Sequence, residues 1–164
     1  MRPADALSFD QLEFGQEWTS EGRLIRADDI HEFADLTGDR NPIHLDPAYA
    51  ATTPYRQCIA HGLLGVAISS GLALDAPKVR TITLLHIREW RFAGPIFIGD
   101  EVRVRNRVVG KTPRGVGRRG EVEWQVQVVN QRGEVVQEGV TATLVEGQAV
   151  ARRPRQPQDG AARA

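Results

Sequence analysis

The segment IAHGLLGVAISSGLAL, residues 59–74, is apolar on nearly every face and is long enough for about four helical turns. A helix without a polar face is expected to be buried on all sides. Gly62, Gly65 and Gly71 would each cost about 1 kcal/mol relative to alanine in an isolated helix, so close packing has to compensate. We therefore predict a central buried helix with a sheet wrapped round it.

The chain downstream of this segment is rich in strand-forming residues. Four segments combine Val, Ile, Thr, Trp and Phe, several of them with alternating apolar and charged residues: 80–92, 100–109, 121–129 and 135–145. The sequence NQRG at 130–133 is typical of a hairpin connection. With a further strand at 17–25, this order predicts an α+β fold in which a curved antiparallel sheet surrounds the helix.

Two shorter helices are expected upstream. Apolar residues at i, i+3 and i+4 in residues 27–36 predict an amphipathic helix that Gly38 ends. Asp46 followed by Pro47 is typical of the start of another helix. Because Pro42 disfavours a helical conformation for the residue before it, we expect the connection between the two helices to be extended or turned.

This connection, TGDRNPIH at 37–44, carries a carboxylate and an imidazole five residues apart. Held on one short loop, Asp39 and His44 are candidates for proton transfer. The alternative is that the segment only joins two helices, since Asp and Asn beside Gly and Pro occur in any turn. Asn41 either orients one of the two side chains or closes an Asx-turn, and we favour the structural role.

The start of the apolar helix offers a second chemical feature. The first backbone N–H groups of a helix have no partner within it, and Gly62 leaves them unobstructed. Such groups stabilise negative charge, so an enolate or thioester oxygen would suit this position. We expect His61, directly before the helix, to cap or position rather than to carry a proton.

Three segments of this chain resemble the MaoC-like, R-specific enoyl-CoA hydratases: FADLTGDRNPIHLDPAYA at 33–50, IAHG at 59–62 and FAGPIFIGD at 92–100. The resemblance extends over residues 17–145 and so covers most of the chain. It implies a hot-dog fold, as the helix-in-sheet argument already suggests. It also implies a homodimer in which the two sheets run together.

The resemblance further implies roles for individual residues. Asp39 and His44 would activate a water molecule for addition across the C2–C3 double bond of a trans-2-enoyl thioester, which gives an R-3-hydroxyacyl product. The Gly62 N–H would bind the thioester carbonyl oxygen, and Ser70 would be a polar group lining the site. Such a lyase of fatty acid metabolism has no cofactor, and coenzyme A enters only as part of the substrate.

Two other functions are compatible with the same scaffold. One is a hot-dog acyl-CoA thioesterase, which would hydrolyse the thioester instead of hydrating the alkene. The other is a non-catalytic subunit that binds acyl-CoA. The presence of both Asp39 and His44 argues against the binding subunit, and the long match around them argues against the thioesterase.

Length and composition set further expectations. The 164 residues suit one domain, placed at 1–150, before a polar, proline-containing and disordered tail at 151–164. One cysteine rules out an internal disulfide framework, and no N-terminal apolar run resembles a signal peptide, so we expect a cytoplasmic protein. With 21 basic and 21 acidic residues, the chain has no net field to attract nucleic acid or a membrane surface.

We expect no metal site, because the four histidines form no i, i+4 pair and Cys58 alone cannot build a zinc cluster. A group of cations occupies a Gly/Pro-containing segment that we place between two strands: Lys111, Arg114, Arg118 and Arg119. We interpret the segment as a solvated hairpin loop. The alternative is that some of these cations meet the phosphates of coenzyme A.

Overall fold

The computed structural model describes residues 5–115 and 119–148. The predicted tail at 151–164 and Arg118 lie outside the described residues. The described residues form one antiparallel sheet with helices on one of its sides, so the predicted α+β class is confirmed. Among these residues, no helix has the length and apolar character needed to cross a membrane.

Six strands make up the sheet: β1 (Glu17–Thr19), β2 (Arg23–Leu24), β3 (Thr81–Phe92), β4 (Glu101–Arg114), β5 (Arg119–Asn130) and β6 (Val135–Glu146). Their order is β1-β4-β5-β6-β3, and β2 pairs with β4 beside β1. All of these pairings are antiparallel. Strand β3 is therefore an edge strand, which has a hydrogen-bonded neighbour on one side only within the described chain.

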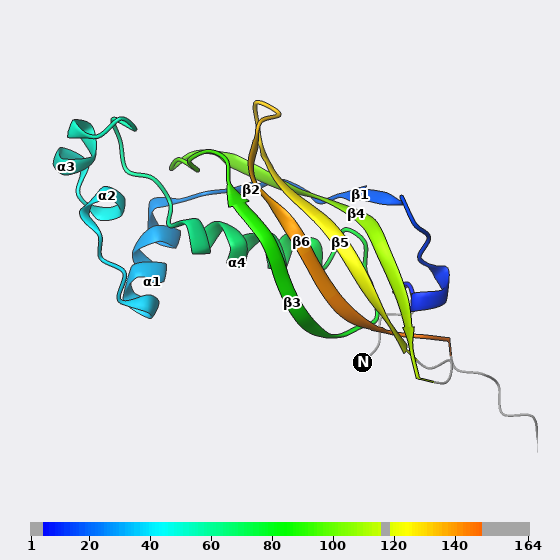
Figure 1. Ribbon diagram of the computed structural model, residues 1–164. Coiled ribbons are helices and arrows are strands. Elements are labelled where there is room, and N and C mark those ends of the chain that lie inside the picture. Colours follow the sequence, from blue (N-terminus) through cyan, green and yellow to red (C-terminus); the bar gives the residue numbers. More distant parts are fainter. Residues whose placement is uncertain (1–4, 116–118, 149–164) are drawn as a thin grey trace, which may run out of the picture.

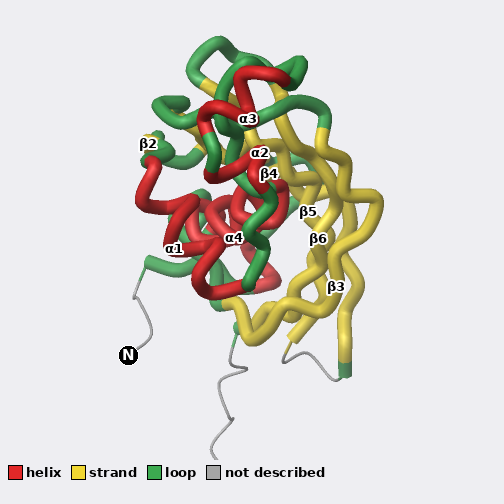
Figure 2. The backbone as a smooth tube through the Cα atoms, turned by 90° about the vertical axis from the view of Figure 1, so that its left-hand side faces the viewer, coloured by secondary structure: helices red, strands yellow, loops and turns green. Residues whose placement is uncertain are grey.

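The helices are η1 (Phe9–Gln11), α1 (Ala27–Thr37), α2 (Pro42–Leu45), α3 (Pro47–Thr52) and α4 (Gly62–Ala73). Helix α4 lies along the concave side of the curved sheet, while α1, α2 and α3 gather beyond one end of it (Figure 1). The view along the other direction separates the helices from the strands into two layers (Figure 2). This arrangement places the short helices next to the beginning of α4.

Helix α4 is buried on the side that faces the sheet, where Leu64 and Ile68 belong to the core. On its other side Leu63 and Leu74 are 66% and 67% exposed. The expectation of burial on all sides is therefore wrong for the single chain. The apolar composition indicates that both faces of the helix are hydrophobic, but it does not indicate which neighbour would cover each face.

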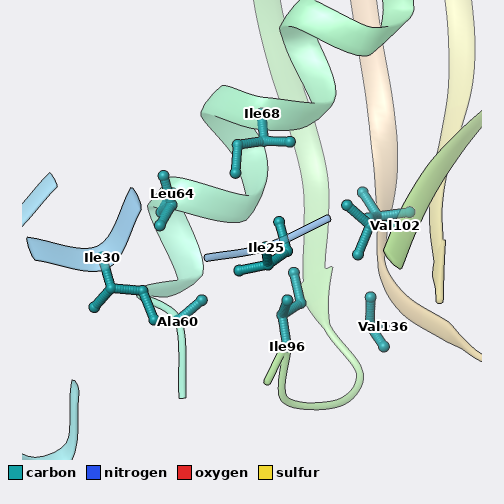
Figure 3. Packing of buried hydrophobic residues seen from close by; sticks show 9 residues of the cluster. Ile25, Ile30, Ala60, Leu64, Ile68, Ile96, Val102 and Val136 are labelled. Carbon is teal, nitrogen blue, oxygen red and sulfur yellow. The ribbon is translucent and has the colours of Figure 1, made fainter. Parts of the chain in front are cut away.

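The core consists of two clusters, one at each end of α4. The first joins Leu64 and Ile68 to residues of the surrounding elements, including Ile25, Ile96 and Val102 (Figure 3). The second joins the inward-facing residues of the central strands to Leu12 near the N-terminus: Val104, Val108, Val122, Trp124, Val126 and Val145. The alternation predicted for these strands is thus the alternation of core and outer face.

Two sequence-based expectations for the sheet need correction. The predicted strand at 17–25 is two short strands, because the Ser20 hydroxyl accepts from the Val104 N–H at 2.9 Å and the ladder is interrupted there. The segment expected to be a hairpin loop is mostly strand, since β4 continues through Pro113 and pairs with β5 as far as Arg114 and Arg119. Pairing with a neighbouring strand outweighs the local turn preference of Gly110 and Pro113.

Candidate active site

The loop that carries the two proton-transfer candidates is held by local hydrogen bonds. Gly38 ends α1 in the left-handed conformation, with φ of 78°. Asn41 caps α2, since its side-chain oxygen accepts from the Ile43 N–H at 3.1 Å. The extended or turned connection that we expected between the helices is therefore short, because α2, a single helical turn, already begins at Pro42. The contact of Asn41 is the structural one that we favoured.

His44 lies in α2, and a hydrogen bond fixes one nitrogen of its ring. Its Nδ1 is 2.8 Å from the carbonyl oxygen of Ile59, the residue three positions before α4. Because a carbonyl oxygen can only accept, Nδ1 carries the hydrogen, and the neutral ring keeps its lone pair on Nε2. Burial lowers the pKa of His44, and the neighbouring His61 ring lowers it further, against opposing effects of Ile59 and Asp39. His44 is thus a neutral base at pH 7.

His61 connects this loop to α4. Its side chain is buried, with 2% exposed, and its Nε2 donates to the backbone carbonyl of Asp39 at 2.9 Å. Its ring lies against the ring of His44, with centroids 3.9 Å apart and planes inclined by 31°, and it also contacts Phe33. His61 caps α4 through its backbone only, so its ring acts on the loop rather than on the helix end. The expected positioning role fits these contacts.

Asp39 completes the group. One carboxylate oxygen of Asp39 and one ring nitrogen from each of His44 and His61 lie within 4.8 Å of one another. A metal ion would need both imidazole lone pairs, which lie in the ring planes, to meet at about 2.0–2.1 Å from one point. Two rings stacked at 3.9 Å direct their lone pairs side by side instead. The geometry therefore suits proton transfer better than metal coordination.

Gly62 is the first residue of α4, so its N–H has no acceptor in a preceding helical turn. The Gln137 side-chain amide donates to the Gly62 carbonyl oxygen at 3.0 Å, and Trp90 Nε1 donates to the Gln137 oxygen at 3.4 Å. A Cβ at position 62 would come within 2.9 Å of the Phe92 ring. The first turn of α4 is thus held against β6 and β3 by side chains from both strands.

A cavity of about 290 Å³ lies further along α4, between this helix and the sheet. Ser70 lines the cavity together with Val66, Ser69 and Ala73 of the same helix. Asp39, His44 and Gly62 are not among its lining residues. Val66 follows Gly62 by about one helical turn, so the cavity begins close to the start of α4 and continues away from it. Ser70 thus lines this cavity, whereas Asp39, His44 and Gly62 do not.

Sequence reasoning missed Gln137 and Trp90, which hold the first turn of α4 against the sheet, and Gly139, which makes room for the Trp90 ring. A Cβ at Gly139 would come within 2.6 Å of the Trp90 ring, and a Cβ at Gly65 within 2.3 Å of the Gln137 amide. The glycine-rich composition of residues 59–74 did predict close packing. It did not indicate the partners, because Gln137 is 75 residues away from Gly62.

The cation group is largely occupied in the described part of the chain. Lys111 donates to the Leu12 carbonyl and lies over the Phe9 ring, and Arg114 pairs with Glu121 at 2.6 Å. These residues lie in the β4–β5 hairpin, at the far end of the sheet from α1, α2 and α3 (Figure 1). Their position does not support contact with a substrate bound at the start of α4.

A second group of possible metal ligands, His86, Glu121 and Glu123, lies on β3 and β5, the two strands on either side of β6. Arg114 already pairs with Glu121, and Arg88 pairs with Glu123 at 2.9 Å. These ion pairs neutralise the two carboxylates. We therefore assign no metal to this group.

Comparison with known proteins agrees with this fold. Residues 11–131 match the model of the MaoC like domain, and the chain belongs to this family. It is 39% identical over 97 residues to the (R)-specific enoyl-CoA hydratase of Aeromonas caviae, which covers 58% of this chain and 70% of the relative.

Solved structures give the same result. An unliganded R-hydratase from Pseudomonas aeruginosa has a TM-score of 0.71 at 31% identity, covering 91% of this chain and 94% of that one. A Mycobacterium tuberculosis protein described as a double hot-dog fold has a TM-score of 0.79 at 20% identity, covering 92% of this chain and 47% of that one. The fold is therefore the hot-dog fold.

Proposed function

We propose that this protein adds water across the C2–C3 double bond of a trans-2-enoyl-CoA thioester to give an R-3-hydroxyacyl-CoA, and that it catalyses the reverse dehydration. The observation that carries this proposal is the placement of His44. Its Nδ1 is fixed on Ile59, its Nε2 has no hydrogen-bond partner among the described residues, and the Asp39 carboxylate lies beside it near the start of α4. The relatives named above as R-hydratases support the reaction type.

The proposed reaction begins with a water molecule between Asp39 and His44. As the water oxygen bonds to C3, His44 Nε2 takes one of its protons, and the π electrons of the double bond move toward the thioester oxygen. Asp39 orients the water and stabilises the imidazolium that forms. His44 then returns a proton to C2, which restores the thioester and the neutral ring. C3 thereby gains the hydroxyl group and C2 gains the proton of the same water molecule.

Negative charge develops on the thioester oxygen in this step, and we assign its stabilisation to the Gly62 N–H. One preorganised donor of this kind contributes about 10²–10³-fold to the rate. Gln137 supports it by holding the carbonyl of the same residue. The proposed reaction needs no cofactor, and coenzyme A takes part only as the carrier of the acyl group.

We also propose that two copies of the chain pair through β3. This edge strand exposes a row of apolar side chains in the single chain: Ile82, Leu84, Leu85, Ile87 and Phe92. The exposed face of α4, with Leu63 and Leu74, adds to the same uncovered apolar surface. Pairing of two β3 strands would join the sheets and cover surface that a single chain leaves in water.

The test of the reaction follows the C2–C3 double bond and the thioester bond in the same experiment. With crotonyl-CoA and trans-2-decenoyl-CoA as substrates, loss of the enoyl-thioester absorbance should occur without release of free thiol. Thiol release with the alkene intact would instead establish a thioesterase. Neither change with either substrate would support a binding subunit, so both of these outcomes contradict the proposal.

The roles of the two side chains are tested by substitution. Asp39→Asn and His44→Ala should each lower kcat by at least about 10², because each removes one partner of proton transfer. Asp28→Asn and His31→Ala are matched controls, since both residues are exposed on α1 and should leave kcat unchanged. Near-normal activity of Asp39→Asn or His44→Ala would show that another pair carries the proton.

The dimer is tested by charge in the proposed interface. Leu85→Lys should shift the protein toward the monomer in sedimentation velocity, because a charge would be buried between two β3 strands. Leu36→Lys changes an equally apolar and more exposed residue on α1, away from β3, and should leave the sedimentation coefficient unchanged. A parent protein that sediments as a monomer at all concentrations would refute the pairing.

A further inference from the structure

The cavity beside α4 has a definite direction and depth. Strand β6 passes from Gln137, which binds the Gly62 carbonyl, to Thr141 and Thr143, which line the cavity. At about 3.3 Å per residue, Thr141 lies about 13 Å and Thr143 about 20 Å from Gln137 along β6. The cavity therefore extends away from the proposed thioester position along the inner face of the sheet.

The lining of this cavity suits an alkyl chain. Most of its residues are apolar or present aromatic rings, among them Val66, Leu84, Ile87, Trp90 and Val126. None of its lining residues is charged. A chain that leaves the thioester at Gly62 would enter beside Val66, one turn further along α4.

Trp124 lines the cavity beside Thr141 and Thr143, and its ring is fixed there. Its Cα is paired with that of Thr141, and its Nε1 donates to the Thr143 hydroxyl at 2.9 Å. The ring of Trp18 meets it edge-on, with centroids 6.3 Å apart. A hydrogen bond on one side and an aromatic neighbour on the other leave the indole little freedom to move.

We propose that Trp124 narrows the acyl site part of the way along the cavity and that it sets the substrate class to medium-length, linear acyl chains of about ten carbons. This inference depends on the proposed function, since it places the thioester at Gly62. Each carbon of an extended chain adds about 1.3 Å, the projection of a C–C bond of about 1.5 Å. About ten carbons thus span the 13 Å or so to Thr141, and longer chains meet the indole.

The test compares kcat/KM across trans-2-enoyl-CoA substrates from crotonyl to tetradecenoyl. The parent protein should reach its maximum near decenoyl and fall for tetradecenoyl. Trp124→Ala should raise the ratio of the tetradecenoyl value to the decenoyl value at least tenfold. Each newly buried methylene contributes about fourfold, and at least two become accommodated. Trp124→Phe, a smaller change for the core, should raise the ratio by a lesser factor.

Leu12→Ala is the control, because it truncates a large buried side chain of the same cluster that does not line the cavity. It should lower thermal stability and leave the ratio unchanged. An unchanged ratio in both Trp124 variants, or an equal rise in Leu12→Ala, would overturn the assignment to Trp124. Absence of hydration of every substrate by the parent would instead refute the proposed function, so the two failures are distinguishable.

Discussion

Gly65 and Gln137 provide a direct test of how α4 is held against the sheet. A Cβ at position 65 would come within 2.3 Å of the Gln137 side-chain nitrogen and 2.8 Å of its Cδ. Gln137 is 2% exposed and connects two groups, donating to the Gly62 carbonyl and accepting from Trp90. Gly65→Ala must therefore displace a buried amide together with both of its hydrogen bonds.

The magnitude follows from three contributions. Overpacking of a filled core costs about 1–3 kcal/mol. Leaving a buried amide without its partners costs about 1–3 kcal/mol. The better helix propensity of alanine returns about 1 kcal/mol. The free energy of unfolding should therefore fall by about 1–5 kcal/mol in Gly65→Ala.

Urea unfolding of four proteins separates the clash from any other effect: the parent, Gly65→Ala, Gln137→Ala and the double variant. All are measured at one protein concentration, because the stability of the proposed dimer would depend on it. In the Gln137→Ala background the added methyl has room, so Gly65→Ala should be neutral or stabilise by up to about 1 kcal/mol. Equal destabilisation in both backgrounds, or no destabilisation in the parent background, would refute the packing argument.

Three further predictions concern the site. Burial lowers the pKa of His44, so the base form persists as pH falls. The value of kcat/KM for hydration should therefore decline only below the usual histidine pKa of about 6.5. A decline that begins above this pH would contradict the pKa shift. His61→Phe keeps an aromatic ring beside His44 but removes a group that lowers the pKa of His44. The decline of kcat/KM at low pH should therefore begin at a higher pH in this variant. An unchanged pH profile would exclude an effect of His61 on the pKa of His44. Asn41→Ala removes the cap of α2 and should lower the free energy of unfolding, measured by urea denaturation, by about 0.5–2 kcal/mol. Asn41→Asp keeps a side-chain acceptor and should lose much less. An equal loss in both variants would show that the cap contributes nothing.

Local signals in the sequence predicted local structure well. The end of α1 at Gly38 and the start of α3 at Asp46 and Pro47 are both confirmed, because each depends on backbone conformation and hydrogen bonds within a few residues. The inward and outward alternation of β4 and β5 also follows from residue type alone. The proximity of Asp39 to His44 needed only a short connection, which the sequence shows.

Contacts between distant segments were not predictable in the same way. Periodicity cannot show that His61 meets the Asp39 carbonyl, 22 residues before it, or that Trp90 lies over Gly139. The turn signals of Gly110 and Pro113 were real local preferences, but the partner strand extended β4 through them. Uniform apolarity of residues 59–74 likewise predicted burial without distinguishing the sheet from a second copy of the chain.

His61 links the two halves of the proposed site. Its backbone begins α4, where the Gly62 N–H is available, and its ring holds the Asp39 carbonyl and supports the His44 ring. A shift of this one residue would move the proposed oxyanion donor and the proton-transfer pair relative to each other. Since the water must reach C3 while the thioester oxygen meets Gly62, the distance between the two halves has to match one substrate geometry. We therefore expect substitutions at His61 to reduce kcat more than they raise KM.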